Sequence, residues 1–139
     1  MLDLYAGVGT FGIINSGLFK EVYIVESDKN CIDAAKINIK NNSIKNAKEI
    51  LLDAMKLKQL TLPKDLFVIT DPPRSGMHPK TIEQLKNLKP KIIIYVSCNI
   101  EQLSKDLNKF SDYSIKSAAL FDLFPQTPHI EAVVELVLR

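Results

Sequence analysis

The chain has few of the residues that build metal centres or disulfide frameworks. Its 139 residues include two cysteines, two histidines and no tryptophan. Two cysteines without a pairing pattern argue against disulfides or an iron–sulfur cluster within this chain, and they favour a reducing compartment, the cytoplasm. The two histidines, His78 and His129, are far apart and lack ligand spacing with Cys31 or Cys98. No metal site is therefore expected.

Long apolar runs and an excess of one charge are also missing. No stretch is long and apolar enough to span a bilayer, and no signal peptide precedes the first expected strand, so we expect no membrane partner. The net charge is only +2, and composition alone therefore does not indicate a nucleic-acid binder. Most lysines are expected to be simply solvated on helix faces. With 46% hydrophobic residues the chain can bury one core, which predicts a single domain over 1–139.

Strand and helix signals alternate along the whole chain. Strands are expected near 2–5, 22–25, 49–52, 66–70, 91–96, 114–121 and 132–138, and helices near 11–16, 28–41, 55–60, 79–88 and 101–109. This alternation predicts an α/β fold with a doubly wound, mostly parallel, seven-stranded sheet and helices on both faces. The last two strands have little helix between them, which predicts a closing antiparallel hairpin at the C-terminus.

A glycine-rich turn follows the first expected strand. Gly7, Gly9 and Gly12 match the spacing G-x-G-x-x-G, which lets a nucleotide-like group lie against the backbone. The next strand ends at Glu26, where a carboxylate can accept hydrogen bonds from a ribose diol. Asp3 and Tyr5 stand just before the glycines. An acid at this position suits a positively charged, phosphate-free ligand better than a pyrophosphate.

Two polar segments follow apolar, β-branched runs. They are Asp-Pro-Pro-Arg-Ser-Gly at 71–76, after the run 66–69, and Ser-Cys-Asn at 97–99, after the run 92–96. The carboxyl ends of neighbouring parallel strands form the ligand crevice of an open α/β sheet, so Asp71, Arg74 and Cys98 are expected in one cleft. Cys98 is the expected nucleophile, since a thiolate attacks readily. Its alternative is a buried strand-end cysteine, and Cys31 is expected to be structural.

Four segments in order carry a family resemblance over nearly the whole chain: DLYAGVGTFG, DPPRSG, YVSCN and FDLFPQTPHIEAVVELV. Together they resemble the S-adenosylmethionine-dependent RNA (uracil-5-)-methyltransferase family, which implies the Rossmann-like class I methyltransferase fold. Ile100 stands where the family usually has proline, and Lys105 where arginine is usual. Family members normally carry an N-terminal RNA-binding domain and a central segment, so we expect this chain to be a catalytic-domain fragment.

The resemblance also implies a reaction and a set of residues. A methyl group would pass from S-adenosylmethionine to carbon-5 of an extruded uridine in tRNA or rRNA. Cys98 would add to carbon-6, Glu131 would remove the carbon-5 proton, and Asp71 and Arg74 would orient the base. The implied cofactor-binding residues are Asp3, Tyr5, Gly7, Gly9, Glu26, Asp53 and Asp71. Asp53 has a nearly equal alternative role as the N-cap of the helix expected near 55–60.

Other functions stay open on the sequence. Amino-directed methyltransferases need an aromatic residue where this chain has Arg74, and RNA cytosine-5 methyltransferases carry a cysteine in the loop that here contains none. A non-catalytic cofactor-binding module and an NAD-dependent oxidoreductase are the remaining alternatives. Three side chains near the C-terminus are expected in the core rather than stacked on a base: Phe121, Leu123 and Phe124. His129 is expected to position its loop or to pack against Phe124.

Overall fold

The computed structural model describes all residues except 124 and 129, so the expectations for Phe124 and His129 lie outside the described residues. The strands are β1 (Leu2–Leu4), β2 (Val22–Glu26), β3 (Ala47–Leu51), β4 (Phe67–Thr70), β5 (Ile92–Ser97), β6 (Tyr113–Phe121) and β7 (Glu131–Leu138). The helices are α1 (Thr10–Ile14), α2 (Lys29–Asn41), α3 (Pro79–Leu88) and α4 (Ile100–Leu107), with short 3₁₀ segments η1 (Ser16–Leu18) and η2 (Ala54–Gln59). The expected alternation is confirmed, although the helix expected near 55–60 is 3₁₀ and that near 11–16 divides into α1 and η1.

Within the described residues the strands form one seven-stranded sheet, in the order β3-β2-β1-β4-β5-β7-β6. Neighbouring strands are parallel except at β7, which runs antiparallel to both β5 and β6. The expected mostly parallel sheet with a C-terminal antiparallel hairpin is therefore confirmed. The connection from β3 returns to the far side of β1, so the winding direction reverses between β1 and β4. In open α/β sheets, ligands bind at the carboxyl ends of the strands beside such a reversal.

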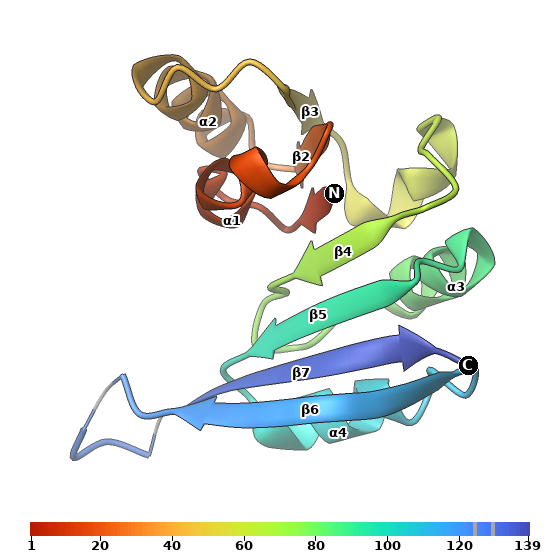
Figure 1. Cartoon of the computed structure of the whole chain (residues 1–139). Helices are drawn as coiled ribbons and strands as arrows, with labels where there is room; N and C mark the ends of the chain where they lie inside the picture. Colours follow the sequence, from red (N-terminus) through yellow and green to blue (C-terminus); the bar gives the residue numbers. More distant parts are fainter. Residues whose placement is uncertain (124, 129) are drawn as a thin grey trace.

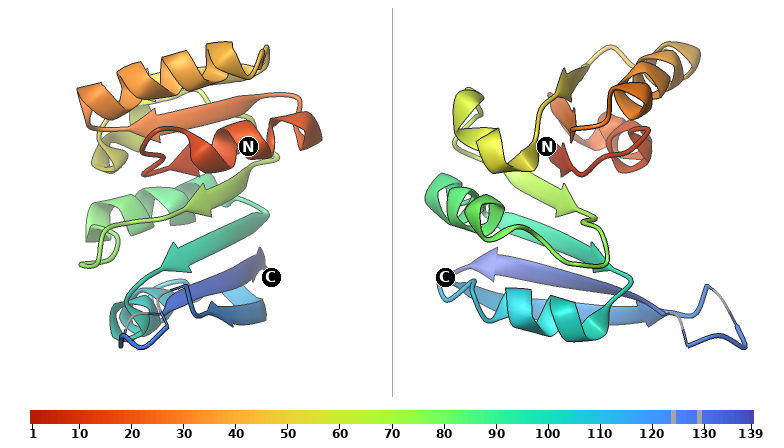
Figure 2. Two further views of the ribbon diagram at one scale, coloured as in Figure 1. Left: turned by 90° about the vertical axis from the view of Figure 1, so that its left-hand side faces the viewer. Right: turned by 180° about the vertical axis from the view of Figure 1, so that it is seen from behind.

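Helices cover the two faces of the sheet unequally (Figures 1 and 2). α1 and α2 lie over one face beside β1, β2 and β3, whereas α3 and α4 lie on the opposite face beside β4 to β7. The sheet has a hydrophobic core on each face, because successive side chains of a strand point to opposite faces. Leu2 and Leu4 join the core under α3, while Ile24 and Ile69 join the core under α1 and α2.

Part of the α1 face carries no helix of the described chain. Ile94 and Val96 on β5, and Val133 on β7, are only half-buried on that face, although the opposite face of the same strands is closed. The uncovered strip meets the carboxyl ends of β4 and β5, and it forms the floor of the site described below.

Among the described helices, none has the length and apolar character that crossing a membrane requires.

Candidate active site

The antiparallel pairing of β5 and β7 brings the two expected reacting groups to the same end of the sheet. Val96 pairs with Val133 and Ser97 with Ala132, the last pair between these strands. Cys98 directly follows β5, and Glu131 is the first residue of β7. Both residues line one pocket together with Val96 and Val133, although they are distant in the sequence.

This pocket has a volume of about 580 Å³ and contains three of the expected catalytic residues. Its lining comprises Phe11, Ile69, Asp71, Ile94, Val96, Cys98, Phe121, Leu123, Glu131 and Val133. Asp71 follows β4 at the strand end, and both its burial and the nearby charge of Glu131 raise the pKa of its carboxyl. The pocket therefore combines a thiol, two electrostatically linked carboxyls and an apolar floor.

Two apolar side chains at this pocket, one aromatic and one aliphatic, are more exposed than the sequence predicted. Phe121 is 48% exposed and Leu123 is 62% exposed, and both line its rim. The prediction that both side chains lie in the core is wrong. Phe121 pairs with Glu131 across β6 and β7, and this face of the two strands carries no helix of the described chain. An apolar rim beside the three polar groups suits the flat face of a heteroaromatic ring.

Arg74 lies on another side of Cys98. Together with Cys98, Asn99, Glu101 and Ile130 it lines a separate hollow of about 260 Å³ that also reaches Ile100 and Pro128. Cys98 therefore borders two cavities, one lined by Asp71 and Glu131 and the other by Arg74. The three other expected catalytic residues thus line cavities that Cys98 shares.

Asp3 lies beneath the glycine-rich turn rather than on its surface. Its side chain is buried, and its Oδ2 accepts a hydrogen bond of 2.7 Å from the backbone N–H of Gly12. Burial raises the pKa of Asp3 to about 7, although the Gly12 N–H opposes the shift. A Cβ on Gly12 would lie 2.7 Å from Cγ1 of Ile24, so only glycine fits between α1 and β2. Asp3 thus fixes the turn from below.

Glu26 braces the same turn from the end of β2. Its Oε2 accepts from the N–H of Gly7 at 3.0 Å, and its Oε1 accepts from the N–H groups of Ser27 and Asp28 at 2.6 and 2.9 Å. Burial works against ionisation, but these backbone donors outweigh it and hold the pKa of Glu26 below its usual value. A charged acceptor therefore stands beside the glycines at the strand end, as the sequence predicted for a diol.

Tyr5 and Asp53 meet in a third hollow, of about 350 Å³, between the glycine-rich turn and the loop after β4. Oδ1 of Asp53 accepts from the N–H of Met55 at 2.8 Å, which confirms its capping role at the start of η2. Tyr5 adopts a φ of 59°, a left-handed conformation that is uncommon outside glycine. Its hydroxyl donates to Oγ1 of Thr81 at 3.4 Å. Capping and lining the hollow are compatible roles for Asp53.

Asn99 is a positioning residue that the sequence reasoning missed. Its Oδ1 caps α4 by accepting from the N–H of Gln102 at 3.1 Å, and its Nδ2 donates to the carbonyl of Arg74 at 3.0 Å. One side chain thus ties the loop after β4 to the start of α4, next to Cys98. Asparagine's strong preference for N-caps was a signal that could have identified half of this role.

Asp106 is a second missed residue, and it holds the same loop from behind. Its buried carboxylate accepts from the N–H of Met77 at 2.9 Å and from the hydroxyl of Tyr95 at 2.8 Å. Lys109 lies 2.9 Å from Oδ1. Gly76 has a φ of 78°, and a Cβ there would lie 2.4 Å from Oδ2 of Asp106. A buried acid within an amphipathic helix was the available signal.

No group of three or more potential metal ligands (His, Cys, Asp or Glu) occurs among the residues that the structure describes. The polar groups of the site are instead carboxylates that accept hydrogen bonds from the glycine-rich turn, together with a thiol and an arginine. Such a set suits an organic ligand with a cationic or hydroxylic end more readily than a metal ion.

The strand order and the site at its reversal define a methyltransferase fold. Solved structures that share it include an rRNA methylase from Streptococcus thermophilus, with a TM-score of 0.77, 15% identity and coverage of 99% of this chain and 86% of that one. TrmN from Thermus thermophilus gives a TM-score of 0.79 at 16% identity, covering 99% of this chain and 43% of that one. At these identities the likeness concerns the fold alone.

The sequence comparison goes further. A family model described as tRNA (Uracil-5-)-methyltransferase matches residues 1–139, and the chain belongs to this family. A tRNA (uracil(54)-C(5))-methyltransferase of Pyrococcus abyssi is 38% identical over 137 residues, which are 99% of this chain and 33% of that protein. An uncharacterized RNA methyltransferase of Caldanaerobacter subterraneus is 40% identical over 135 residues, 96% of this chain and 30% of that protein.

A crystal structure of the Pyrococcus abyssi enzyme in complex with S-adenosyl-L-homocysteine also resembles this chain. It gives a TM-score of 0.88 at 38% identity and covers 98% of this chain and 33% of that one. The chain therefore spans about a third of the length of the relatives it matches.

Proposed function

We propose that residues 1–139 form the catalytic domain of an RNA methyltransferase that methylates carbon-5 of a uridine in tRNA or rRNA. The observation that carries the proposal is the pocket at the ends of β4, β5 and β7, which Cys98, Glu131 and Asp71 line together. Addition to carbon-6 of a pyrimidine ring requires a nucleophile, and the later elimination requires a proton acceptor close to it. The pocket contains a side chain for each role. Membership of the tRNA (Uracil-5-)-methyltransferase family supports the choice of uracil.

The residues along the carboxyl ends of β1 to β4 fit S-adenosylmethionine as the cofactor. Glu26 stands ready for ribose hydroxyls, and the hollow lined by Tyr5 and Asp53 has room for a ring system. Gly7 and Gly9 belong to the turn after β1, with Asp3 beneath it, and Asp71 follows the neighbouring strand β4. The relative crystallised with S-adenosyl-L-homocysteine supports this assignment. When bound, S-adenosylmethionine supplies an electrophilic methyl group.

The chain's own groups account for the remaining steps. The Cys98 thiolate adds to carbon-6 of the uracil, and the ring electrons make carbon-5 nucleophilic. Carbon-5 would then take the methyl group as the methyl–sulfur bond of the cofactor breaks, which leaves S-adenosyl-L-homocysteine. Glu131 then removes the proton left on carbon-5, carbon-5 and carbon-6 regain their double bond, and the carbon–sulfur bond breaks to release the thiolate. Burial and the nearby charge of Glu131 raise the pKa of Asp71, and its carboxyl forms a hydrogen bond with the edge of the ring. Arg74 lines the second cavity beside Cys98 and orients the base or its phosphate.

Mass spectrometry with RNA containing 5-fluorouridine tests the proposal, because fluorine at carbon-5 blocks the final elimination. The chain is incubated with S-adenosylmethionine and this RNA, and we expect a covalent adduct in the wild type and in the matched control Cys31→Ala. Cys98→Ala should form none, and Glu131→Gln should still form it. An adduct that survives Cys98→Ala would assign the nucleophile elsewhere. Absence of any adduct while both cofactor and RNA bind would favour the alternative function, a non-catalytic cofactor-binding module.

A further inference from the structure

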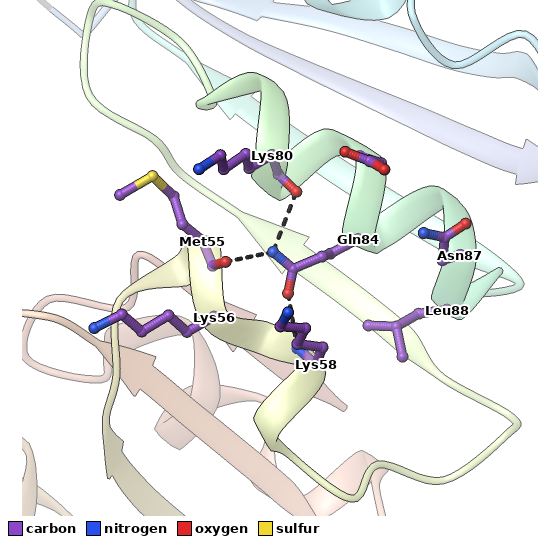
Figure 3. A pocket seen from close by; sticks show the side chains of 8 residues that line it. Met55, Lys56, Lys58, Lys80, Gln84, Asn87 and Leu88 are labelled. Carbon is purple, nitrogen blue, oxygen red and sulfur yellow. Dashed lines mark hydrogen bonds between the residues drawn. The ribbon is translucent and has the colours of Figure 1, made fainter.

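A groove of about 560 Å³ runs between η2 and α3, apart from the cavities around Cys98 (Figure 3). Lys56 and Lys58 contribute from η2, and Lys80 contributes from the first turn of α3. In Figure 3 the ammonium groups of Lys56 and Lys80 extend toward the same side, with Met55 between them. The sequence alone spreads these lysines over separate elements, and only the packing of η2 against α3 gathers them.

The walls of this groove are held by Gln84 and not by the lysine side chains. Its Nε2 donates to the carbonyl of Met55, and its Oε1 accepts from the backbone N–H of Lys58 at 2.7 Å. Nε2 also reaches the carbonyl of Lys80 at 3.3 Å. Because only backbone atoms of the lysines take part in these bonds, the three ammonium groups are available to a ligand.

These lysines also differ from others of the chain in their ion pairing. Lys29, Lys48 and Lys91 each have a carboxylate partner: Asp33, Glu21 and Asp65 respectively. Within the described part of the chain, no carboxylate lies within 4.0 Å of the ammonium groups of Lys56, Lys58 or Lys80. Glu83 is the only acid among the eight lining residues, so the groove has a net positive charge.

The groove adjoins the hollow that the cofactor is proposed to occupy. Met55 lines both the groove and this hollow, which contains Tyr5 and Asp53. Lys80 follows Pro79, which lines the hollow together with Pro73, Ser75 and Gly76 of the loop that begins with Asp71. A polyanion lying along the lysines would therefore reach the loop that carries Asp71 and Arg74.

We propose that the Lys56–Lys58–Lys80 groove binds phosphates of the RNA substrate's backbone. The proposal rests on the proposed function and adds an anion-binding surface to it. Several separate ammonium point charges along a groove match a repeating phosphate chain, and their aliphatic stems line the walls while their charged ends reach solvent. Such contacts set position without reading sequence.

Salt-dependent RNA binding by the whole chain tests the proposal. The variant Lys56→Gln/Lys58→Gln/Lys80→Gln is compared with Lys29→Gln/Lys36→Gln/Lys48→Gln, which loses the same charge from ion-paired lysines on α2 and β3. The slope of log K against log salt is negative, and each lost phosphate contact should reduce its magnitude by about 0.7 for single-stranded RNA. The groove variant should therefore have a slope smaller in magnitude by roughly 2. Its affinity should fall about equally for unrelated RNA sequences. The control should keep the wild-type slope.

Equal slopes in the two variants, or a wild-type chain that does not bind RNA, would overturn the proposal. Groove-dependent binding of a glutamate-rich peptide without RNA binding would overturn it too, by making the groove a protein-docking surface. Binding is read without catalysis, so its outcome is separate from that of the adduct experiment. A wild-type chain that binds RNA through the groove but forms no fluorouridine adduct would contradict the proposed function alone.

Discussion

At the scale of single residues, the glycine-rich turn is held by contacts that tolerate no added atom. Gly12 lies against Ile24, and its backbone N–H donates a hydrogen bond to Oδ2 of Asp3. The turn is therefore fixed before any ligand arrives, which lowers the entropy that binding must lose.

Gly12→Ala tests this packing directly. The new methyl group would meet Cγ1 of Ile24 at 2.7 Å, and overpacking of this kind costs about 1–3 kcal/mol of unfolding free energy. Urea denaturation measures the loss. Gly17→Ala is the matched control, because nothing lies within 4 Å of its added Cβ and the change should stay within about 0.5 kcal/mol. Equal stabilities of the two variants would contradict the close approach.

Asp3 makes stability depend on pH in an unusual direction for an acid. Its pKa of about 7 exceeds the ordinary value of 3.8, so the folded chain holds a proton that the unfolded chain releases between about pH 4 and 7. The contribution of this group is complete below pH 4 and is lost as the pH rises toward 7.

Asp3→Asn should remove that loss, since the amide oxygen can still accept from Gly12 and never ionises. We expect the stability of the variant relative to wild type to increase by roughly 2 to 4 kcal/mol between pH 4.5 and 7.5. Urea denaturation at several pH values gives the comparison, and the other titrating groups cancel in the difference. A difference that stays constant with pH would disprove the raised pKa.

At the scale of secondary-structure elements, α4 positions the loop that begins with Asp71. Asn99 at its N-terminus holds the carbonyl of Arg74, and Asp106 near its C-terminus holds the N–H of Met77. The helix therefore fixes two backbone points of one loop beside Cys98. This arrangement keeps Asp71 and Arg74 aligned with the thiol.

Asn99→Asp separates this positioning role from helix capping. The aspartate keeps an oxygen for the N–H of Gln102 but loses the donor to Arg74 and sets a carboxylate against that carbonyl. We expect thermal stability close to wild type and fluorouridine adduct formation slowed about tenfold, since misplacing a reacting group by a fraction of an ångström is costly. Asn99→Ala should in addition lower stability by about 1 kcal/mol, because it removes the cap. Wild-type adduct rates in Asn99→Asp would show that the bond to Arg74 carries no positioning role.

At the scale of the whole molecule, the sequence predicted the sheet because each of its signals is local. Apolar runs and the polar residues that end them mark the strands, and their alternation with helix signals predicts a doubly wound, mostly parallel sheet. The order of the strands within the sheet comes from the structure. Contacts between segments that are distant in the sequence were harder to predict from it. Nothing in the local pattern of Phe121 indicates that its face of β6 lacks a helix, and nothing near Lys56 indicates that Lys80 will lie across a groove from it. Asn99 was missed for the same reason, because its partner is the carbonyl of Arg74.

The ladder between β5 and β7 has a consequence for insertions in this part of the chain. Six consecutive pairs, from Ile92–Val137 to Ser97–Ala132, fix the face of the sheet on which each side chain of β7 lies. A one-residue insertion inside β7 would turn Glu131 to the far face of the sheet. An insertion ahead of Glu131 leaves these pairs unchanged, so the orientation of this carboxylate is sensitive to insertions on one side of it and insensitive on the other.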